Sequence, residues 1–365
     1  MALAYWLAAH LQHISTSKLL SWLQTFNTIE NLFHATINEW QAAGLSATEI
    51  QLMRTIPWKE IEKLLAWHSP PTRTILHFDD QYYPPLLKSL VDAPLVLYVE
   101  GDINLLSLPQ IAMVGSRKAS PIGLRNAEQF AHDLSEVGLI VTSGLALGID
   151  AASHRGALQA QAPTIAVFGT GLNYIYPPTH QKLAQDILNY GGVFISEFPL
   201  DMPPRALNFP VRNRIISGLA LGVLIVEAAL KSGSLITARL ALEQGREVFA
   251  IPGAIQHRPS KGCHYLIKQG GAKLVESIQD ILEELTMLSP NSLKLIKENQ
   301  KIPSKSIDLE QKAMLVFDQL AYETVPLDVI ILRSGLTRGE VSSILLALEL
   351  NGIIRAAPGG YIRAC

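Results

Sequence analysis

Seven short apolar runs recur between about residues 72 and 285, and amphipathic stretches separate most of them. Runs that are apolar at consecutive positions are typical of strands covered on both faces. The stretches between the runs have a helical period, so strands and helices alternate along the chain. This alternation predicts an α/β fold with a Rossmann-like, doubly wound and mostly parallel sheet. The runs are 95–99, 111–114, 139–141, 165–168, 193–195, 223–226 and 248–251.

The rest of the chain predicts two smaller units. All five tryptophans lie within the first 67 residues, where apolar residues recur at helical spacing. This pattern predicts a helical domain over residues 1–70, and the polar residues 286–308 predict a linker. Residues 309–365 have three helical patterns, near 309–321, 326–334 and 337–351, followed by a hairpin around Pro358-Gly359-Gly360. Three helices closed by a hairpin predict a winged-helix domain.

Composition excludes several classes of protein. The chain has 365 residues and a net charge of −2, but residues 201–275 hold 10 basic and only 4 acidic residues. We therefore expect any polyanion to bind this part. Cys263 and Cys365 are too few and too distant for a disulfide framework or a cysteine metal cluster. The longest apolar run, 215–230, is too short for a bilayer span and no leader pattern is visible, so we expect a cytoplasmic protein without membrane contact.

Several loops that follow predicted strands are candidate binding loops, because ligands of open α/β sheets bind beyond the carboxyl ends of the strands. Residues 114–118, 208–214 and 231–234 combine arginine or lysine with glycine, serine or asparagine, a pattern suited to phosphate. Arg212 and Arg214 lie near the start of a predicted helix, where a cation is unfavourable unless an anion is near. The cations expected around one crevice are Arg117, Arg205, Arg212, Arg214 and Lys231.

Two further loops are rich in glycine. Residues 142–150 end in Asp150, expected as a helix cap, and lead to His154, expected on the surface. Residues 168–178 carry Tyr174 and Tyr176, expected to cover the edge of the sheet. The glycine spacing disfavours NAD, and the turn at 231–234 lacks the spacing of an ATP-binding loop. We expect no cofactor and no metal ion.

Phe209 lies beside the predicted cations and is suited to stack on a nucleobase. A cationic track with an aromatic platform is what single-stranded nucleic acid requires. The loops bring together no nucleophile, buried acid pair or set of metal ligands, so they favour binding over catalysis. The residues therefore predict a groove for single-stranded nucleic acid.

The order of the motifs resembles the DNA-processing protein A (DprA/Smf) family over residues 72–285. The motifs read VGSR, SGLALGIDAASHRGAL, GTGLNYIYP, FPVRNRIISG, VEAALKSGSLITA and VFAIPG. The resemblance implies a bacterial protein that binds single-stranded DNA arriving during natural transformation, protects it and helps load the recombinase RecA. It also implies a homodimer formed through the α/β domain, and an N-terminal domain of the sterile-alpha-motif or helix-hairpin-helix type.

The resemblance assigns site residues. The family's Gly-Ser/Thr-Arg motif falls on Gly115, Ser116 and Arg117, and its base-stacking aromatic falls on Phe209. Some relatives have a lysine where this chain has Ala206, so Arg205 is expected to replace it. The family's motifs also fall on Arg212, Asn213, Arg214, Ser232, Gly233 and Ser234. With Arg205 and the cation Lys231 added, the expected single-stranded DNA site comprises Gly115, Ser116, Arg117, Arg205, Phe209, Arg212, Asn213, Arg214, Lys231, Ser232, Gly233 and Ser234. The implied dimer contact comprises His264, Leu266 and Ile267.

Two other functions remain open. Related α/β folds include phosphoribohydrolases that hydrolyse nucleoside monophosphates, but their Pro-Gly-Gly-x-Gly-Thr signature is replaced here by Lys231-Ser232-Gly233-Ser234. A winged-helix transcription regulator is the second alternative. Residues 309–365 carry 5 basic and 6 acidic groups, which is a poor balance for binding duplex DNA. We therefore expect a DNA-binding protein that is not an enzyme.

Overall fold

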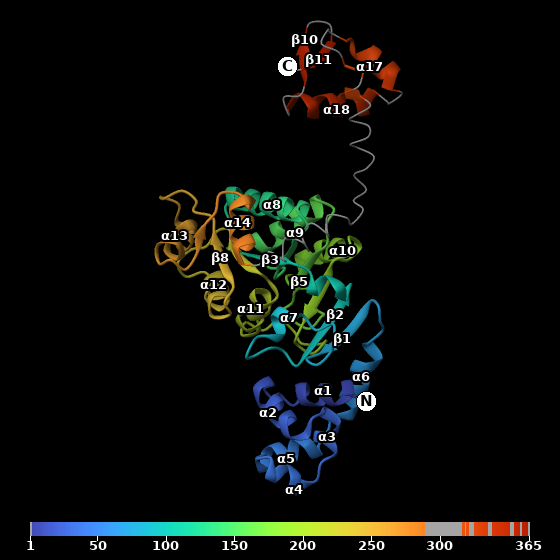
Figure 1. Ribbon diagram of the computed structural model, residues 1–365, viewed down its shortest axis with the longest axis vertical. Helices are drawn as coiled ribbons and strands as arrows, with labels where there is room; N and C mark the ends of the chain where they lie inside the picture. Colours follow the sequence, from blue (N-terminus) through green and yellow to red (C-terminus); the bar gives the residue numbers. More distant parts are fainter. Residues whose placement is uncertain are drawn as a thin grey trace. The chain divides into compact units, whose positions relative to one another are not determined.

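The structure is a computed structural model of the chain. It describes residues 2–288, 316–317, 319–320, 325–334, 338–350, 354–357 and 360–363. The chain divides into two compact units, Met1–Gln300 and Lys301–Cys365. The first unit contains a group of N-terminal helices and a central α/β sheet, and the second contains helices and a hairpin (Figure 1). Within the described ranges, no helix is long and apolar enough to cross a membrane.

A nine-stranded sheet forms the centre of the first unit, with the order β1-β2-β6-β5-β4-β3-β7-β8-β9. Every neighbouring pair from β6 to β9 is parallel, whereas β2 pairs antiparallel with both β1 and β6. The predicted doubly wound, mostly parallel sheet is confirmed. The strands are β1 (Arg73–His77), β2 (Val96–Gly101), β3 (Gln110–Val114), β4 (Ile140–Ser143), β5 (Thr164–Val167), β6 (Val193–Ser196), β7 (Gly222–Ile225), β8 (Glu247–Ala250) and β9 (Lys273–Leu274).

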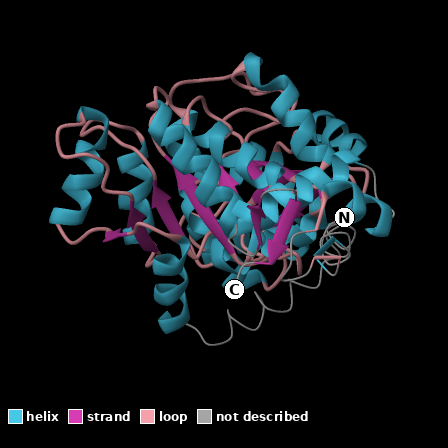
Figure 2. Ribbon diagram, turned by 90° about the horizontal axis from the view of Figure 1, so that it is seen from above, coloured by secondary structure: helices cyan, strands magenta, loops and turns pink. Residues whose placement is uncertain are grey.

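Helices cover both faces of the sheet (Figure 2). Successive residues of a strand point to opposite faces, so a strand that is apolar throughout needs helices on both faces to bury its side chains. Along β3, Ile111 and Met113 pack with α8, whereas Ala112 and Val114 belong to the core that contains α11 residues. All four side chains are buried, which explains the uninterrupted apolar run. The helices of this part are α7 (Pro85–Lys88), α8 (Pro121–Glu136), α9 (Ile149–Gln159), α10 (Gln181–Asn189), α11 (Asn208–Leu219), α12 (Ser234–Glu243), α13 (Lys261–Lys268) and α14 (Ile278–Leu288), with 3-10 turns at Ile103–Ser107, Pro178–His180 and Arg258–Ser260.

Six short helices precede the sheet. Capping boxes start two of them, from Thr36 to Glu39 and from Ser46 to Glu49. The helices share one core with the sheet, and the ring of Trp6 stacks on His77 of β1 with the centroids 5.4 Å apart. They end close to the predicted boundary at residue 70. The helices are α1 (Ala2–Leu11), α2 (Thr16–Phe26), α3 (Ile29–His34), α4 (Ile37–Ala42), α5 (Ala47–Arg54) and α6 (Trp58–Trp67).

The second unit contains α17 (Leu327–Ser334), α18 (Arg338–Leu350) and a hairpin of β10 (Ile354–Ala357) and β11 (Gly360–Arg363). It has its own core, which includes Ile330 of α17, Val341 of α18 and Ile354 of β10. Helices followed by an antiparallel hairpin form the predicted winged-helix arrangement. Most of the predicted linker 286–308 and of the predicted helix 309–321 lies outside the described residues.

Candidate nucleic-acid interface

The candidate site lies where the connections of the sheet change direction. The chain leaves β3 through α8 toward β4 on one side, and leaves β7 through α12 toward β8 on the other. The loops after β3 and β7 therefore border the crevice that doubly wound folds use for ligands. The two loops are joined directly, because the Ser116 backbone N–H donates to the Glu227 carbonyl at 2.7 Å.

The loop after β3 is packed tightly against its neighbours. A Cβ on Gly115 would lie 2.5 Å from Cγ1 of Ile149, so a larger residue does not fit. Gly148 has a φ of 78°, and a Cβ there would collide with the carbonyl oxygen of Ser116. The Ser116 hydroxyl accepts the Lys118 backbone N–H at 3.1 Å. These contacts fix the backbone that carries the exposed Arg117 side chain.

Arg117, Phe209 and Tyr176 come together from three segments, and we call this group the aromatic platform. The guanidinium carbon of Arg117 lies over the Phe209 ring, 5.3 Å from its centroid. The Tyr176 ring lies 5.4 Å from the Phe209 ring and is tilted by 40°. Gly169 makes room for Phe209, because a Cβ there would be 2.7 Å from Cδ1 of the ring. The platform offers an aromatic surface and a cation in one place.

Arg212 does not belong to this surface, which corrects the prediction for it. It is 3% exposed, and its Nη1 donates to the Gly144 carbonyl at 2.8 Å and to the Val167 carbonyl. The anion that compensates its charge is the buried carboxylate of Asp150. The unfavourable cation near the start of α11 is thus balanced within the protein. Arg212 thus ties the end of β5 to the residue that follows β4.

Burial changes the pKa of both members of this pair. Desolvation lowers the pKa of Arg212 to about 10, although the Asp150 charge opposes the shift. Desolvation likewise raises the pKa of Asp150, against the effects of Arg212 and of the N–H groups of Ala146 and Gly144. Arg212 therefore stays charged at neutral pH, and its charge needs a partner inside the fold.

Asp150 and His154 differ from their predicted roles. Gly148 occupies the N-cap position of α9, and the Asp150 carboxylate accepts the Gly144 N–H at 3.2 Å instead. His154 is buried rather than on the surface, with Nδ1 2.9 Å from the Thr164 hydroxyl. Burial lowers the pKa of His154 to about 3, so the ring is neutral at pH 7. Both side chains support the interior and neither is open to a ligand.

Arg205 and Arg214 line a different cavity, of about 710 Å³, between the N-terminal helices and the segment 197–205. Arg214 pairs with Glu197 and, at 3.3 Å, with Asp92, so two carboxylates compensate its charge. Arg205 is exposed, and Asn213 is half-buried on α11. Arg117 and Phe209 do not line this cavity. The sequence predicts that Arg117, Arg205 and Arg214 surround one crevice, but in the structure Arg205 and Arg214 lie at a cavity that Arg117 does not line.

The turn at 231–234 begins α12 beside the end of β7. Lys231 and Gly233 are exposed, whereas Ser234 is buried. The hydroxyls of Ser232 and Ser234 lie 2.7 Å apart and bond to each other. The Ser232 hydroxyl also accepts the Ser234 backbone N–H at 3.4 Å. The Ser232 hydroxyl thus accepts one N–H at the helix start, and Lys231 is the exposed cation of this turn.

Glu227 is a residue whose role the sequence reasoning missed. Its carboxylate accepts the Ser120 backbone N–H at 3.0 Å and the Ser120 hydroxyl, and its side chain is 4% exposed. It thereby holds the start of α8 against the end of β7. The sequence offers one indication of this role, which is that an acidic residue directly follows the apolar run 223–226. A carboxylate buried next to a strand needs hydrogen-bond partners.

The predicted dimer segment also needs a correction. Leu266 is 8% exposed and belongs to the interior core, so it offers no surface to a partner. Ile267 packs partly against the same core, and His264 Nε2 lies 3.3 Å from the Gly253 carbonyl oxygen. Tyr265 is the large exposed side chain of α13, at 51%. The amphipathic α13 thus turns Leu266 inward.

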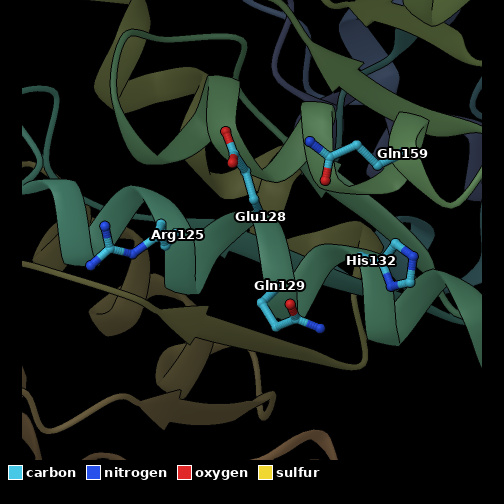
Figure 3. A pocket seen from close by; sticks show the side chains of 5 residues that line it. All are labelled: Arg125, Glu128, Gln129, His132 and Gln159. Atoms are coloured by element: carbon cyan, nitrogen blue, oxygen red, sulfur yellow. The ribbon is translucent and has the colours of Figure 1, made fainter. Parts of the chain in front are cut away.

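A shallow polar pocket of about 420 Å³ lies away from these loops. Its residues come from α8 and α9, and Glu128 pairs with Arg155 at 3.1 Å. Figure 3 shows Arg125, Glu128, Gln129 and His132 along α8, with Gln159 on the neighbouring helix. None of the predicted site residues lines this pocket.

Comparisons with known proteins agree with the resemblance. The model of the DNA recombination-mediator protein A family matches residues 74–286, and that of the DprA winged helix domain matches residues 300–360. Protein Smf of Escherichia coli is 46% identical, over 88% of this chain and 86% of its own length. DNA processing protein DprA of Streptococcus pneumoniae is 47% identical, over 56% of this chain and 72% of its own length.

Solved structures give the same result. An X-ray structure of DNA processing protein A from Streptococcus pneumoniae matches with a TM-score of 0.66 and 37% identity, over 77% of this chain and 97% of that one. The Helicobacter pylori protein, solved to describe its single-stranded DNA binding mode, matches with a TM-score of 0.53 and 31% identity, over 59% of this chain and 96% of that one. With a family model that spans most of the sheet and relatives aligned over most of their length, the chain belongs to the DNA recombination-mediator protein A family.

Proposed function

We propose that this protein binds single-stranded DNA that enters the cell during natural transformation, protects it and helps load RecA onto it. The observation that carries the proposal is the aromatic platform at the carboxyl edge of the sheet, where Arg117 lies over Phe209 beside Tyr176. Stacking rings and a guanidinium suit a flexible single strand, whose bases are free to leave their neighbours. The single-stranded DNA binding mode of the Helicobacter pylori relative supports the same assignment.

The proposed contacts follow the exposure of each residue. Arg117 and Lys231, both exposed, are assigned to phosphates, and Phe209 to a base. Gly115, Ser116, Ser232, Gly233 and Ser234 shape the two loops that border the crevice. Arg212 acts on the DNA only through the loops it holds. Arg205 and Arg214 line the separate cavity and are assigned, with Asn213, to the margin of the site.

We further propose a homodimer through the surface around Tyr265. Leu230 and Ile255 are also exposed, at 59% and 73%, and they lie on segments bonded to the start of α13. The Lys261 amine donates to the Ile255 carbonyl at 2.6 Å, and the Gly262 N–H donates to the Ala228 carbonyl at 2.6 Å. Three exposed apolar side chains on linked segments favour an interface. We also propose that the protein acts in the cytoplasm, because it would act there together with RecA.

We propose that the protein is not an enzyme. The acids nearest the crevice are engaged elsewhere, since Glu227 binds Ser120 and Asp150 binds the Gly144 N–H. A phosphoribohydrolase requires a free acid beside the ribose, and the chain's own loops occupy both carboxylates. The winged helix is assigned an accessory role because its charge balance is unfavourable for duplex DNA.

The test is a gel-shift series with single-stranded and duplex DNA of the same length at two salt concentrations. We expect tighter binding of the single strand, a loss of affinity at higher salt, and no strong preference for a particular sequence. Equal affinity for duplex would support the regulator instead. Release of free base from nucleoside monophosphates would support the enzyme.

A further inference from the structure

The loop after β5, residues 169–178, exposes two aromatic rings although its backbone is held firmly. The Gly171 N–H donates to the Met202 carbonyl at 2.9 Å, and the Asn173 N–H donates to the Leu200 carbonyl at 3.1 Å. Yet Tyr174 and Tyr176 are 43% and 41% exposed. A fixed backbone that keeps two large rings in water costs apolar burial, so covering the edge of the sheet does not explain both of them.

Tyr176 is the more open ring of the aromatic platform. Phe209 is half-buried, because Gly169 lies against its ring and the Arg117 guanidinium lies over it. The Tyr176 ring stands 5.4 Å from that of Phe209 and keeps much of its surface in solvent. A strand that reaches Phe209 therefore passes an adjacent aromatic surface that is already oriented.

We propose that Tyr176 is a second base-stacking position, which takes the nucleobase next to the one on Phe209. This proposal rests on the proposed binding of single-stranded DNA and adds a residue and a specificity to it. Stacking on a ring face does not distinguish one base from another, so the ligand is any base of the bound strand. The phenol hydroxyl is not required for this role.

The angle between the two rings has a consequence for the strand. Neighbouring bases in a stacked single strand are nearly parallel, whereas the rings of Tyr176 and Phe209 are tilted by 40°. Two consecutive bases that each lie flat on one ring must therefore give up their mutual stacking. This cost is larger for oligo-dA, whose purines stack strongly, than for oligo-dT. The platform should prefer oligo-dT.

The experiment measures the affinity of the full chain for oligo-dT and oligo-dA by fluorescence anisotropy. The variants are Tyr176→Ala, Tyr176→Phe, Phe209→Ala and the double Ala variant, with Tyr174→Ala as the matched control. Tyr174 belongs to the same loop and has the same exposure, but within the described residues it has no ring contact with Phe209. Thermal melts confirm that each variant is folded.

We expect Tyr176→Ala to weaken oligo-dT binding roughly fivefold or more, and Tyr176→Phe and Tyr174→Ala to stay within about twofold of wild type. The salt dependence should not change, because no phosphate contact is removed. The preference for oligo-dT over oligo-dA should shrink. The double variant should bind more weakly than Phe209→Ala alone, which shows that Tyr176 contacts the strand itself.

Two outcomes would overturn the inference. Tyr176→Ala with wild-type affinity, while Phe209→Ala is weakened, would leave Phe209 as a single stacking position and the proposed function intact. A double variant equal to Phe209→Ala would mean that Tyr176 only positions Phe209. Failure of the wild type to bind single strands would instead remove the proposed function, so the two failures are distinguishable.

Discussion

Asp150 and Arg212 bind opposite ends of the same residue, Gly144. The Asp150 carboxylate accepts the Gly144 N–H at 3.2 Å, and Arg212 donates to the Gly144 carbonyl at 2.8 Å. A Cβ on Gly144 would lie 2.5 Å from the guanidinium. The loop after β4 is thus fixed by hydrogen bonds to two buried side chains of opposite charge, and Gly148 of that loop packs against the Ser116 carbonyl. Both side chains therefore support a loop that packs against the candidate binding loop after β3.

Arg212→Met should destabilise the fold by about 3–5 kcal/mol, because it leaves the Asp150 carboxylate buried without its cation. Urea unfolding measures the change. Arg239→Met is the matched control, since the Arg239 side chain is 70% exposed and pairs only with Glu243 among the described residues. The double variant Asp150→Asn/Arg212→Met should cost less than the sum of the single changes. Equal losses for Arg212→Met and the control would contradict a structural role.

Arg117→Ala should weaken single-strand binding and lower the magnitude of the log K against log salt slope by about 0.7, as expected for one lost phosphate contact. Arg117→Lys should bind with intermediate affinity, because it keeps the charge and loses the paired geometry of the guanidinium. Arg125→Ala is the control, since Arg125 lies on α8 in the shallow pocket of Figure 3. An unchanged slope in Arg117→Ala would contradict the phosphate contact.

Gly169→Ala should reduce affinity severalfold while the melting temperature changes little. The new Cβ would lie 2.7 Å from Cδ1 of Phe209, so the half-buried ring has to move. Phe209→Ala sets the scale, with an expected loss of about 1–3 kcal/mol for one stacked base. In the Phe209→Ala background, Gly169→Ala should have no further effect. A loss that persists in that background would place the effect of Gly169 elsewhere.

The strands β2 to β8 could be predicted because most of their side chains are buried on both faces, which leaves an apolar run that periodicity detects. The edge strands β1 and β9 are partly exposed and gave no such run. The position of Arg212 could not be predicted in the same way. Arginine next to asparagine at a helix start is typical of a surface that binds anions, and nothing local indicates that the anion is the chain's own Asp150. The pairing depends on how the loop after β4 meets α11, which is a property of the whole fold.

The aromatic platform was only half predictable. Phe209 follows from the motif FPVRNR, whereas Tyr176 lies in another loop and acquires its significance from the ring contact of 5.4 Å. Leu266 illustrates the reverse error. On a short helix, Leu266 and Tyr265 are neighbours in sequence, but they point in different directions, and only the packing of α13 on the core shows which is inside.

Tyr265→Glu should convert a dimer into a monomer in light scattering at micromolar concentration, because a charge in an apolar interface is costly. The melting temperature of the protomer should change little, as Tyr265 is half exposed. Leu266→Glu is the contrasting variant. It puts a charge into the core, so it should reduce the yield of folded protein. A wild-type mass of one chain, or a dimer that survives Tyr265→Glu, would reject this interface.

The buried imidazole of His154 should make the fold sensitive to acid. Its pKa is lowered by burial to about 3 from an ordinary value of 6.5. Below about pH 6.5 the imidazole is protonated in the unfolded chain but stays neutral in the folded protein. The contribution of His154 to the free energy of unfolding is therefore fully present above this pH and is lost as the pH falls toward 3. One such proton changes the free energy of unfolding by about 1.4 kcal/mol per pH unit.

His154→Gln should remove this contribution. Urea unfolding at pH 5, 6 and 7 should give a pH slope that is smaller than that of wild type by up to one proton, most clearly between pH 5 and 6. The slope is the informative quantity, because the substitution also changes the bond to Thr164 and shifts stability equally at every pH.

His10, whose pKa burial lowers to about 4, provides an independent comparison. His10→Gln should reduce the slope similarly, and the double variant should lose both contributions, since the two sites lie in different parts of the fold. Parallel stability curves for wild type and His154→Gln would show that this ring takes up its proton equally well in the folded and unfolded states.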